Sequence, residues 1–143
     1  MLDWSLQSDA ATNSRLQGKK VEVPVLSMLD VMAWVPTGVP IKTLKTDMQG
    51  FDFNAVASLP RHQLTRVDSI MTEVYLAAAP YSGVQNDFCR DWVPFIKSVG
   101  CTIQSIVEQC ENKKLPGAEV AAFCREGGRR LGDCEADAFW SCK

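Results

Sequence analysis

The sequence predicts an α/β fold, a layered and mostly parallel sheet that ends in an antiparallel hairpin. Two apolar runs with strand character, residues 41–46 and 67–76, enclose a short segment whose apolar residues recur at helical spacing. A second helical pattern over residues 88–99 follows, and then an alternating segment at 101–108. Residues 136–140 are the antiparallel partner that completes the predicted hairpin.

Length and composition predict one globular domain. The chain has 143 residues, of which 46% are hydrophobic and 22% are charged. We predict a polar lead-in over residues 1–20 and a domain over 21–143 with a cysteine-containing loop at 110–134. The net charge is −2 and basic residues do not cluster beyond three scattered pairs, which is not the pattern of a nucleic-acid-binding protein. The longest uncharged stretch, 74–86, is too short to span a membrane.

The first predicted elements precede the apolar run at 41–46. Residues 21–25 alternate in polarity and predict a strand, which Pro24 restricts to a sheet edge or a strand end. Ser27 and Asp30 have the spacing of a capping box, so a helix is expected to begin there. Pro36 and Gly38 are expected to end this helix.

The central elements follow the same logic. Residues 52–59 predict a short helix that stops before Pro60. The second half of 67–76 is apolar on both faces, as in a central parallel strand. Pro94 allows two interpretations of the next helix: either Asp91 caps it and Pro94 lies in its first turn, or the helix is kinked. Gly100 is expected to end it.

Two carboxylates stand out on the predicted strands. Asp47 follows the run 41–46 directly, and Glu73 lies within the run 67–76. Burying an unpaired charge costs several kcal/mol, so an acid there is rarely present for stability alone. Ligands of open α/β sheets bind outside the carboxyl ends of the strands, which is where Asp47 is expected.

These two segments resemble the FkbM-type methyltransferases, which are class I enzymes that depend on S-adenosylmethionine. The family pattern is a strand of the form L-K-x-D-x-E/Q-G-x-E, followed by a strand that ends in E-V or E-I. Here it reads Leu44-Lys45-Thr46-Asp47-Met48-Gln49-Gly50-Phe51-Asp52 and then Glu73-Val74. The likeness extends over residues 20–109 and 134–141, and it implies part of a Rossmann-like sheet.

The resemblance implies roles for five residues. Asp47 and Glu73 would be catalytic, because a carboxylate can orient or deprotonate the acceptor hydroxyl. Lys45, Asp52 and Tyr81 would lie on the substrate side. The implied cofactor is S-adenosylmethionine, and the implied acceptor is a hydroxyl of a small molecule or a glycan.

Structural alternatives stay open for the same residues. Asp47 could instead cap the next helix or close a turn with Gly50. Asp52 stands where the family usually has the longer Glu, which favours helix capping. Glu73 could face a polar cavity or pair with a cation such as Lys45. Lys45 lies on the same side of its strand as Asp47, which favours a salt-bridge partner over a catalytic base. The ring of Tyr81 could pack on the sheet.

The glycine-rich cofactor motif of class I methyltransferases is missing. None of the nine glycines falls in a Gly-x-Gly pattern, so no cofactor-binding residues are assigned. The resemblance therefore covers only the carboxyl-terminal half. We expect a partner, either an amino-terminal cofactor-binding half or a second copy in a homo-oligomer. The alternatives are a non-catalytic remnant and a disulfide-stabilised binding module.

The cysteines favour disulfide bonds. All six lie after residue 88: Cys89, Cys101, Cys110, Cys124, Cys134 and Cys142. Without a Cys-x-x-Cys pair, and with His62 as the only histidine, no metal site is expected. Disulfides favour a secretory lumen or an extracellular location, although Asp3 and Asp9 interrupt any signal peptide. The alternative is that some are buried thiols, as the apolar position of Cys101 allows.

Overall fold

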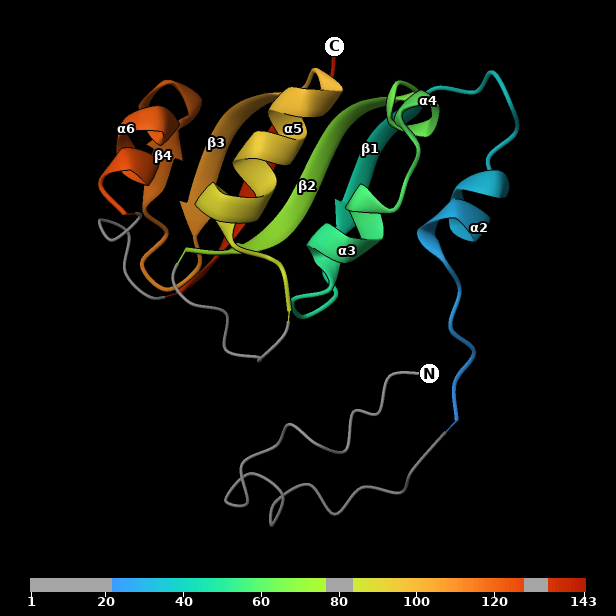
Figure 1. The fold of residues 1–143 in the computed structure, drawn as a ribbon, viewed down its shortest axis with the longest axis horizontal. Helices are drawn as coiled ribbons and strands as arrows, with labels where there is room; N and C mark the ends of the chain where they lie inside the picture. The colour runs from blue at the N-terminus through green and yellow to red at the C-terminus, as the bar shows by residue number, and fades with distance from the viewer. Residues whose placement is uncertain (1–21, 77–83, 128–133) are drawn as a thin grey trace.

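The computed structural model describes residues 22–76, 84–127 and 134–143, and it places a helical layer against a mixed five-stranded sheet (Figure 1). The strands are β1 (Ile41–Thr46), β2 (Val67–Tyr75), β3 (Thr102–Glu108), β4 (Lys114–Pro116) and β5 (Glu135–Ser141). The helical elements are α2 (Met28–Ala33), α3 (Asp52–Ala57), α4 (Arg61–Leu64), η2 (Phe88–Trp92), α5 (Val93–Val99), η3 (Gly117–Glu119) and α6 (Val120–Arg125). Their order in the chain confirms the α/β class.

The strand order is β1-β2-β5-β3-β4, and it corrects the expected parallel sheet. Only β1 and β2 are parallel neighbours, whereas β5 is antiparallel to both β2 and β3, and β4 is antiparallel to β3. The expected hairpin partner of residues 101–108 is confirmed. The prediction of a mostly parallel sheet was wrong because the last strand inserts between β2 and β3. Those two strands run in the same direction but are not adjacent.

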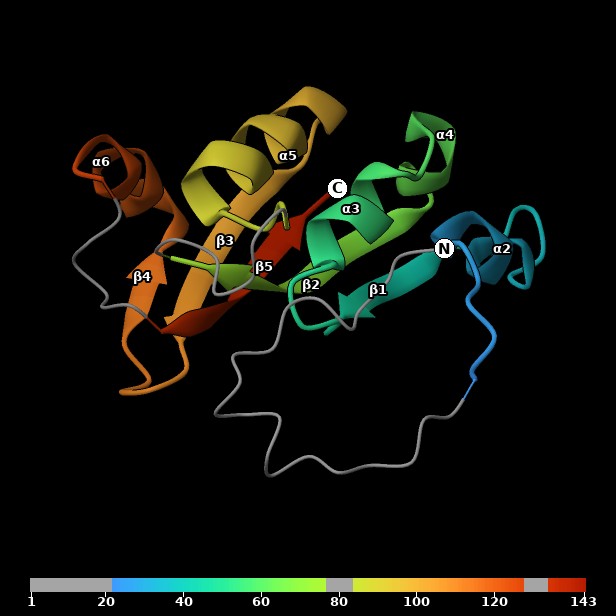
Figure 2. The same cartoon turned by 60° about the horizontal axis from the view of Figure 1, so that its bottom comes forward.

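The hydrophobic core lies between the sheet and the helices. Figure 2 shows α3, α5 and α6 on the same side of the sheet. Alternation points Ile70 and Val74 of β2 to this side, where both are at most 1% exposed. Trp140 of β5 stacks on Trp92 with ring centroids 5.9 Å apart. Its indole N–H donates to the Thr72 hydroxyl at 3.2 Å, which satisfies the one polar atom that the ring buries.

The expected strand at residues 21–25 is a second correction. Val21 lies outside the described residues, and residues 22–25 are not in a strand. The side chains of Val23 and Val25 are 70% and 90% exposed. Figure 1 shows this segment leading away from the sheet. An alternating sequence becomes a strand only where a neighbouring strand completes its hydrogen bonds, and none of the described strands lies beside this one.

Both capping predictions can be compared with the structure. In α2 the Ser27 hydroxyl accepts from the Asp30 N–H at 3.1 Å, and Asp30 accepts from the Ser27 N–H in return, so the capping box is confirmed. Before Pro94 the cap is Asp87 rather than Asp91. The chain makes the π-helical turn η2 and then enters α5 with Pro94 in its first turn. Gly100 ends α5 at φ 87°, as expected.

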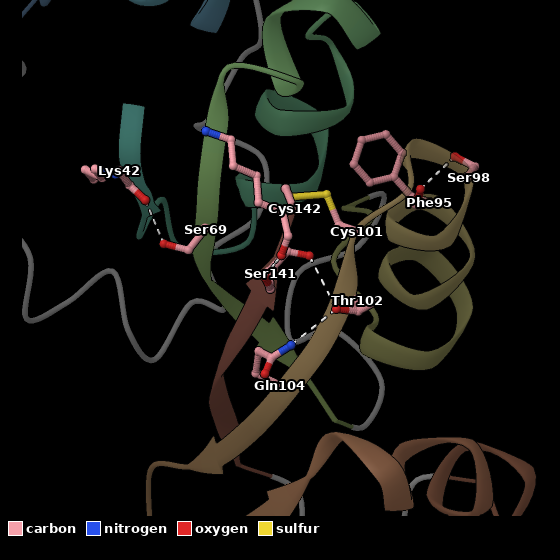
Figure 3. The surroundings of a disulfide bond; sticks show 10 residues. Lys42, Ser69, Phe95, Ser98, Cys101, Thr102, Gln104, Ser141 and Cys142 are labelled. Carbon is pink, nitrogen blue, oxygen red and sulfur yellow. Dashed lines mark hydrogen bonds between the residues drawn. A yellow bond between two sulfur atoms is a disulfide. The ribbon is translucent and has the colours of Figure 1, made fainter. Parts of the chain in front are cut away.

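All six cysteines form disulfides, as the sequence favoured. Cys89–Cys124 joins η2 to α6, and Cys110–Cys134 joins the turn after β3 to the start of β5. Cys101–Cys142 joins the start of β3 to the end of β5, beside the Thr102–Ser141 contact (Figure 3). Between Cys110 and residue 127, where only a loop was expected, the chain contains β4, η3 and α6. No helix in the described ranges has the length and apolarity needed to cross a membrane.

Candidate functional site

The two predicted catalytic acids meet at the carboxyl ends of β1 and β2. Thr46 pairs with Thr72, so Asp47 follows β1 at the level of Glu73 on β2. Alternation turns Glu73 away from the face that carries the helices. The two carboxyls are close enough for the charge of Asp47 to raise the pKa of Glu73. The structure therefore brings both acids to the same edge of the sheet.

Glu73 is a buried acid that pairs with no cation in the part of the chain that the structure describes. Its side chain is 4% exposed, and its Oε2 atom has no hydrogen-bond partner among the described residues. Burial raises the pKa of Glu73 to about 7 from an ordinary 4.5, and the nearby charges of Glu135, Asp47 and Asp52 add to the rise. A polar contact with the Gln109 side chain acts in the opposite direction. Glu73 can therefore exchange a proton near neutral pH.

Asp47 and Lys45 form an ion pair at the rim of this site. Their charged groups are 3.6 Å apart, and both side chains are about half exposed. This confirms Lys45 as a salt-bridge partner of Asp47 rather than of Glu73. In the described part of the chain Asp47 neither caps the next helix nor closes the turn at Gly50. At that exposure the pair contributes little to stability.

Asp52 shapes the turn between β1 and α3. It is fully buried at the first position of α3, and its two carboxylate oxygens accept the Met48 N–H at 3.3 and 3.1 Å. The cap residue of α3 is Phe51, whose side chain makes no capping hydrogen bond. Asp52 thus closes the preceding turn, which differs from the N-cap role that the sequence favoured. Tyr81 lies outside the described residues.

The turn at Gly50 requires glycine. Gln49 and Gly50 both have positive φ, 49° and 96°, and the turn brings the backbone against the buried Tyr75 side chain. A Cβ on Gly50 would lie 2.8 Å from the Tyr75 hydroxyl. Conformation and contact both select glycine at this position of the motif.

The Asn86 side chain connects three elements around the site, and the sequence analysis did not identify this residue. It is fully buried, and its Oδ1 accepts from the Trp92 indole N–H at 2.8 Å and from the Phe53 N–H at 3.2 Å. Its Nδ2 donates to the Glu73 backbone oxygen at 3.0 Å. One side chain thereby joins β2, α3 and η2. A lone Asn ahead of a helix carries no sequence signal for such a role.

Gln109 and Glu135 complete the surroundings of Glu73, and sequence reasoning missed both. Gln109 follows β3, Glu135 begins β5, and the Gln109 N–H donates to the Glu135 backbone oxygen at 3.0 Å. In the sheet, Asp137 is the register partner of Glu73, and Glu135 is that of Tyr75. Their proximity to Glu73 depends on the register of β5 against β2, and the sequence does not specify that register.

Two other features among the described residues are candidates for holding a ligand. A cavity of about 370 Å³ lies between α5, β3 and α6, with Ile96, Ile103 and Trp140 in its walls and none of the candidate acids among its lining residues. Glu108 lies within ligand distance of Cys110 and Cys134. Both sulfur atoms are in the disulfide, so neither cysteine can bind a metal ion as a thiolate in the oxidised chain.

Comparison with known proteins gives no family assignment. No family model matches the chain, and no significant match is found among curated proteins or solved structures. Function must therefore be inferred from the site itself.

Proposed function

We propose that this chain is the acceptor-side half of an FkbM-like O-methyltransferase that uses S-adenosylmethionine, and that Glu73 is its general base. The observation that carries the proposal is the Glu73 carboxyl, which is buried at the end of a parallel strand pair and has a pKa of about 7. Its Oε2 atom has no hydrogen-bond partner within residues 22–76, 84–127 and 134–143. A general base is most effective when its pKa lies near the working pH.

The role of Glu73 would be to accept the proton of the acceptor hydroxyl. A hydroxyl of a sugar or another small molecule could donate to Oε2, which is the open acceptor on this carboxyl. Asp47 and Lys45, half exposed at the rim, could bind further polar groups of the acceptor. Because Asp52 is occupied by the Met48 N–H, its contribution would be to hold the turn.

The residues of this chain do not fit the cofactor. The sequence has no Gly-x-Gly turn, and the described residues contain no strand ahead of β1. S-adenosylmethionine would have to be held by another polypeptide segment. Among the described residues β1 pairs only with β2, so its outer edge offers unpaired backbone groups to such a segment. The exposed side chains of Trp34 and Val39 lie on the segment that leads into β1.

The test is methyl transfer by the protein purified from its native source. It would be incubated with methyl-labelled S-adenosylmethionine and a panel of sugar and polyketide hydroxyl acceptors. We expect labelled product, and we expect Glu73→Gln to lower the rate about 10²- to 10⁴-fold. Asp68→Asn is the matched control, because this acid lies on the same strand but pairs with Lys42 and Lys143. Equal rates for the two variants would exclude Glu73 as the base.

A disulfide-stabilised binding module is the second candidate. The observation that favours it is the set of three disulfides, which is typical of secreted domains. On this proposal the acids are scaffold, and Asp47→Asn would leave binding of the protein or glycan partner unchanged. Absence of methyl transfer together with partner capture that survives Asp47→Asn would favour this candidate over the first.

A further inference from the structure

The Cys110–Cys134 disulfide borders the Glu73 site on two sides. The residue before Cys110 is Gln109, whose side chain contacts the Glu73 carboxyl, and the residue after Cys134 is Glu135, whose charge acts on it. A backbone hydrogen bond of 3.0 Å joins Gln109 to Glu135. Both neighbours of Glu73 are therefore one residue away from the same covalent bond.

A buried carboxylate stabilises the turn that carries Cys110. Glu108 is 1% exposed, and its oxygens accept the N–H groups of Cys110 at 2.5 Å and of Glu111 at 2.8 Å. Charge-assisted bonds of this kind fix a turn more firmly than neutral ones. With the turn and the disulfide both in place, Gln109 has little freedom to leave Glu73.

This disulfide is also the one most open to a reagent. Cys110 is exposed, whereas the other five cysteines are buried or half-buried. Thiol–disulfide exchange requires direct access of the attacking thiolate to a sulfur. A limiting amount of a dithiol is therefore expected to reduce Cys110–Cys134 before the other two bridges.

We propose that Gln109 is the positioning residue of the Glu73 carboxyl, and that the Cys110–Cys134 disulfide is a redox-sensitive clasp that holds Gln109 and Glu135 against it. A dithiol supplies two electrons and two protons: the S–S bond breaks, two cysteine thiols form, and the dithiol becomes a disulfide. Gln109 and Glu135 then lose their fixed positions, and water reaches Glu73. This inference rests on the proposed function, because it concerns the same carboxyl. Its test, however, does not require methyl transfer.

The charges around Glu73 determine the direction of the expected effect. The acids that face it are Asp47 after β1, Asp52 on α3, and Glu135 and Asp137 on β5, and the nearby Lys45 is paired with Asp47. Burial is the largest cause of the raised pKa of Glu73, so opening the site lowers that pKa toward 4.5. Removing the Gln109 side chain alone raises the pKa of Glu73, because the contact between Gln109 and the Glu73 carboxyl lowers that pKa.

The experiment is a carbon-13 NMR titration of the glutamate carboxyls in the oxidised chain, with the Glu73 signal identified by its loss in Glu73→Gln. Three variants are compared with the wild type: the double substitution Cys110→Ser/Cys134→Ser, the single substitution Gln109→Ala, and the control Cys89→Ser/Cys124→Ser. The control removes a bridge that spans 35 residues but lies at η2 and α6. Selective reduction of the wild-type chain replaces the first variant if that variant does not fold.

We expect the Glu73 midpoint to fall from about 7 toward 4.5 without the 110–134 bridge, to rise in Gln109→Ala, and to stay unchanged in the control. An unchanged midpoint without the bridge would overturn the clasp, as would an equal fall in the control. An unchanged midpoint in Gln109→Ala would overturn the positioning role. If these shifts occur and no methyl transfer is found, only the proposed function fails.

Discussion

At the scale of single residues, Glu73 illustrates how burial changes the chemistry of a carboxyl. The side chain is nearly inaccessible, has acids as neighbours and has no paired cation among the described residues. A carboxyl in such a place remains protonated to a higher pH than usual, because the neutral form avoids the desolvation cost. When the Glu73 carboxyl loses its proton, the buried charge lowers the free energy of unfolding. Unfolding experiments at different pH values can therefore detect the titration of Glu73.

Glu73 should make the protein less stable as the pH rises. Its pKa is about 7 in the folded chain and near 4.5 when unfolded, so the folded state holds the proton more tightly. The resulting stability is fully present below pH 4.5 and is lost as the pH rises through 7. We expect Glu73→Gln to be more stable than the wild type at pH 8 by on the order of 2 kcal/mol.

Urea unfolding at pH 4, 6 and 8 measures this difference. The two proteins should differ least at pH 4, where the wild-type carboxyl is protonated in both states. A stability difference between the proteins that does not change with pH would show that Glu73 titrates at its ordinary value.

The turn at Gly50 should tolerate no side chain. Gly50→Ala places a Cβ 2.8 Å from the Tyr75 hydroxyl at a φ of 96°, and we expect a loss of about 3 kcal/mol. Gly38→Ala is the matched control, since φ is 86° there but no atom lies within 4 Å of the new Cβ. Its expected loss is about 1 kcal/mol. Equal losses in chemical denaturation would mean that only the backbone conformation matters.

Residue-level reasoning from the sequence reached part of this site. Asp47 and Glu73 could be found because an acid in an apolar strand pattern conflicts with burial. Gln109 and Glu135 could not, because each reaches Glu73 only through the register of β5 against β2 and β3. Asn86 was missed for a related reason, since its three partners come from β2, α3 and η2.

At the scale of elements, Asn86 holds the helical layer against the sheet near the site. Asn86→Ala would leave the Trp92 indole N–H and the Phe53 N–H without their buried acceptor. We expect a loss of about 3 kcal/mol, because buried groups that lose a partner keep their desolvation cost. Ser98→Ala, which removes an exposed hydroxyl bonded to the Phe95 carbonyl, should change stability by less than about 0.5 kcal/mol.

Calorimetric or denaturant unfolding of both variants provides the comparison. If Asn86→Ala loses no more stability than Ser98→Ala, then the Asn86 side chain does not hold β2, α3 and η2 together. The indole fluorescence of Trp92 offers a second readout, because its ring contacts both Phe53 and Trp140.

Most elements could be predicted because their patterns are local. The capping box at Ser27 and the glycine at position 100 depend only on nearby residues, and both predictions are confirmed. The parallel sheet was a wrong prediction because strand order depends on where β5 inserts, a non-local event with no periodic signal. The prediction of a strand from the alternating residues 21–25 was wrong for the same reason, because a strand needs a neighbouring strand to pair with.

At the scale of the whole molecule, three disulfides join the second half of the chain to itself. Cys101–Cys142 and Cys110–Cys134 connect opposite ends of β3 and β5, and Cys89–Cys124 fastens η2 to α6. Each bridge removes conformational entropy from the unfolded chain. Residues 22–76 contain no cysteine, so no disulfide constrains this half of the chain.

Removing one bridge should lower global stability by a predictable amount. For Cys89→Ser/Cys124→Ser the chain-entropy estimate is about 4 kcal/mol at a separation of 35 residues. Thermal unfolding of the oxidised proteins measures the change. A loss below about 1 kcal/mol would indicate that η2 and α6 stay together without the bond.

The central claim is that Glu73 is a carboxyl that titrates near neutral pH at the end of two parallel strands. The most direct measurement is the carbon-13 titration of its side chain in the oxidised wild-type protein, with Glu73→Gln as the reference that identifies the signal. We predict a midpoint near 7. A midpoint near 4.5 would contradict it, because the carboxyl would then be a solvated surface acid with no special capacity to accept a proton.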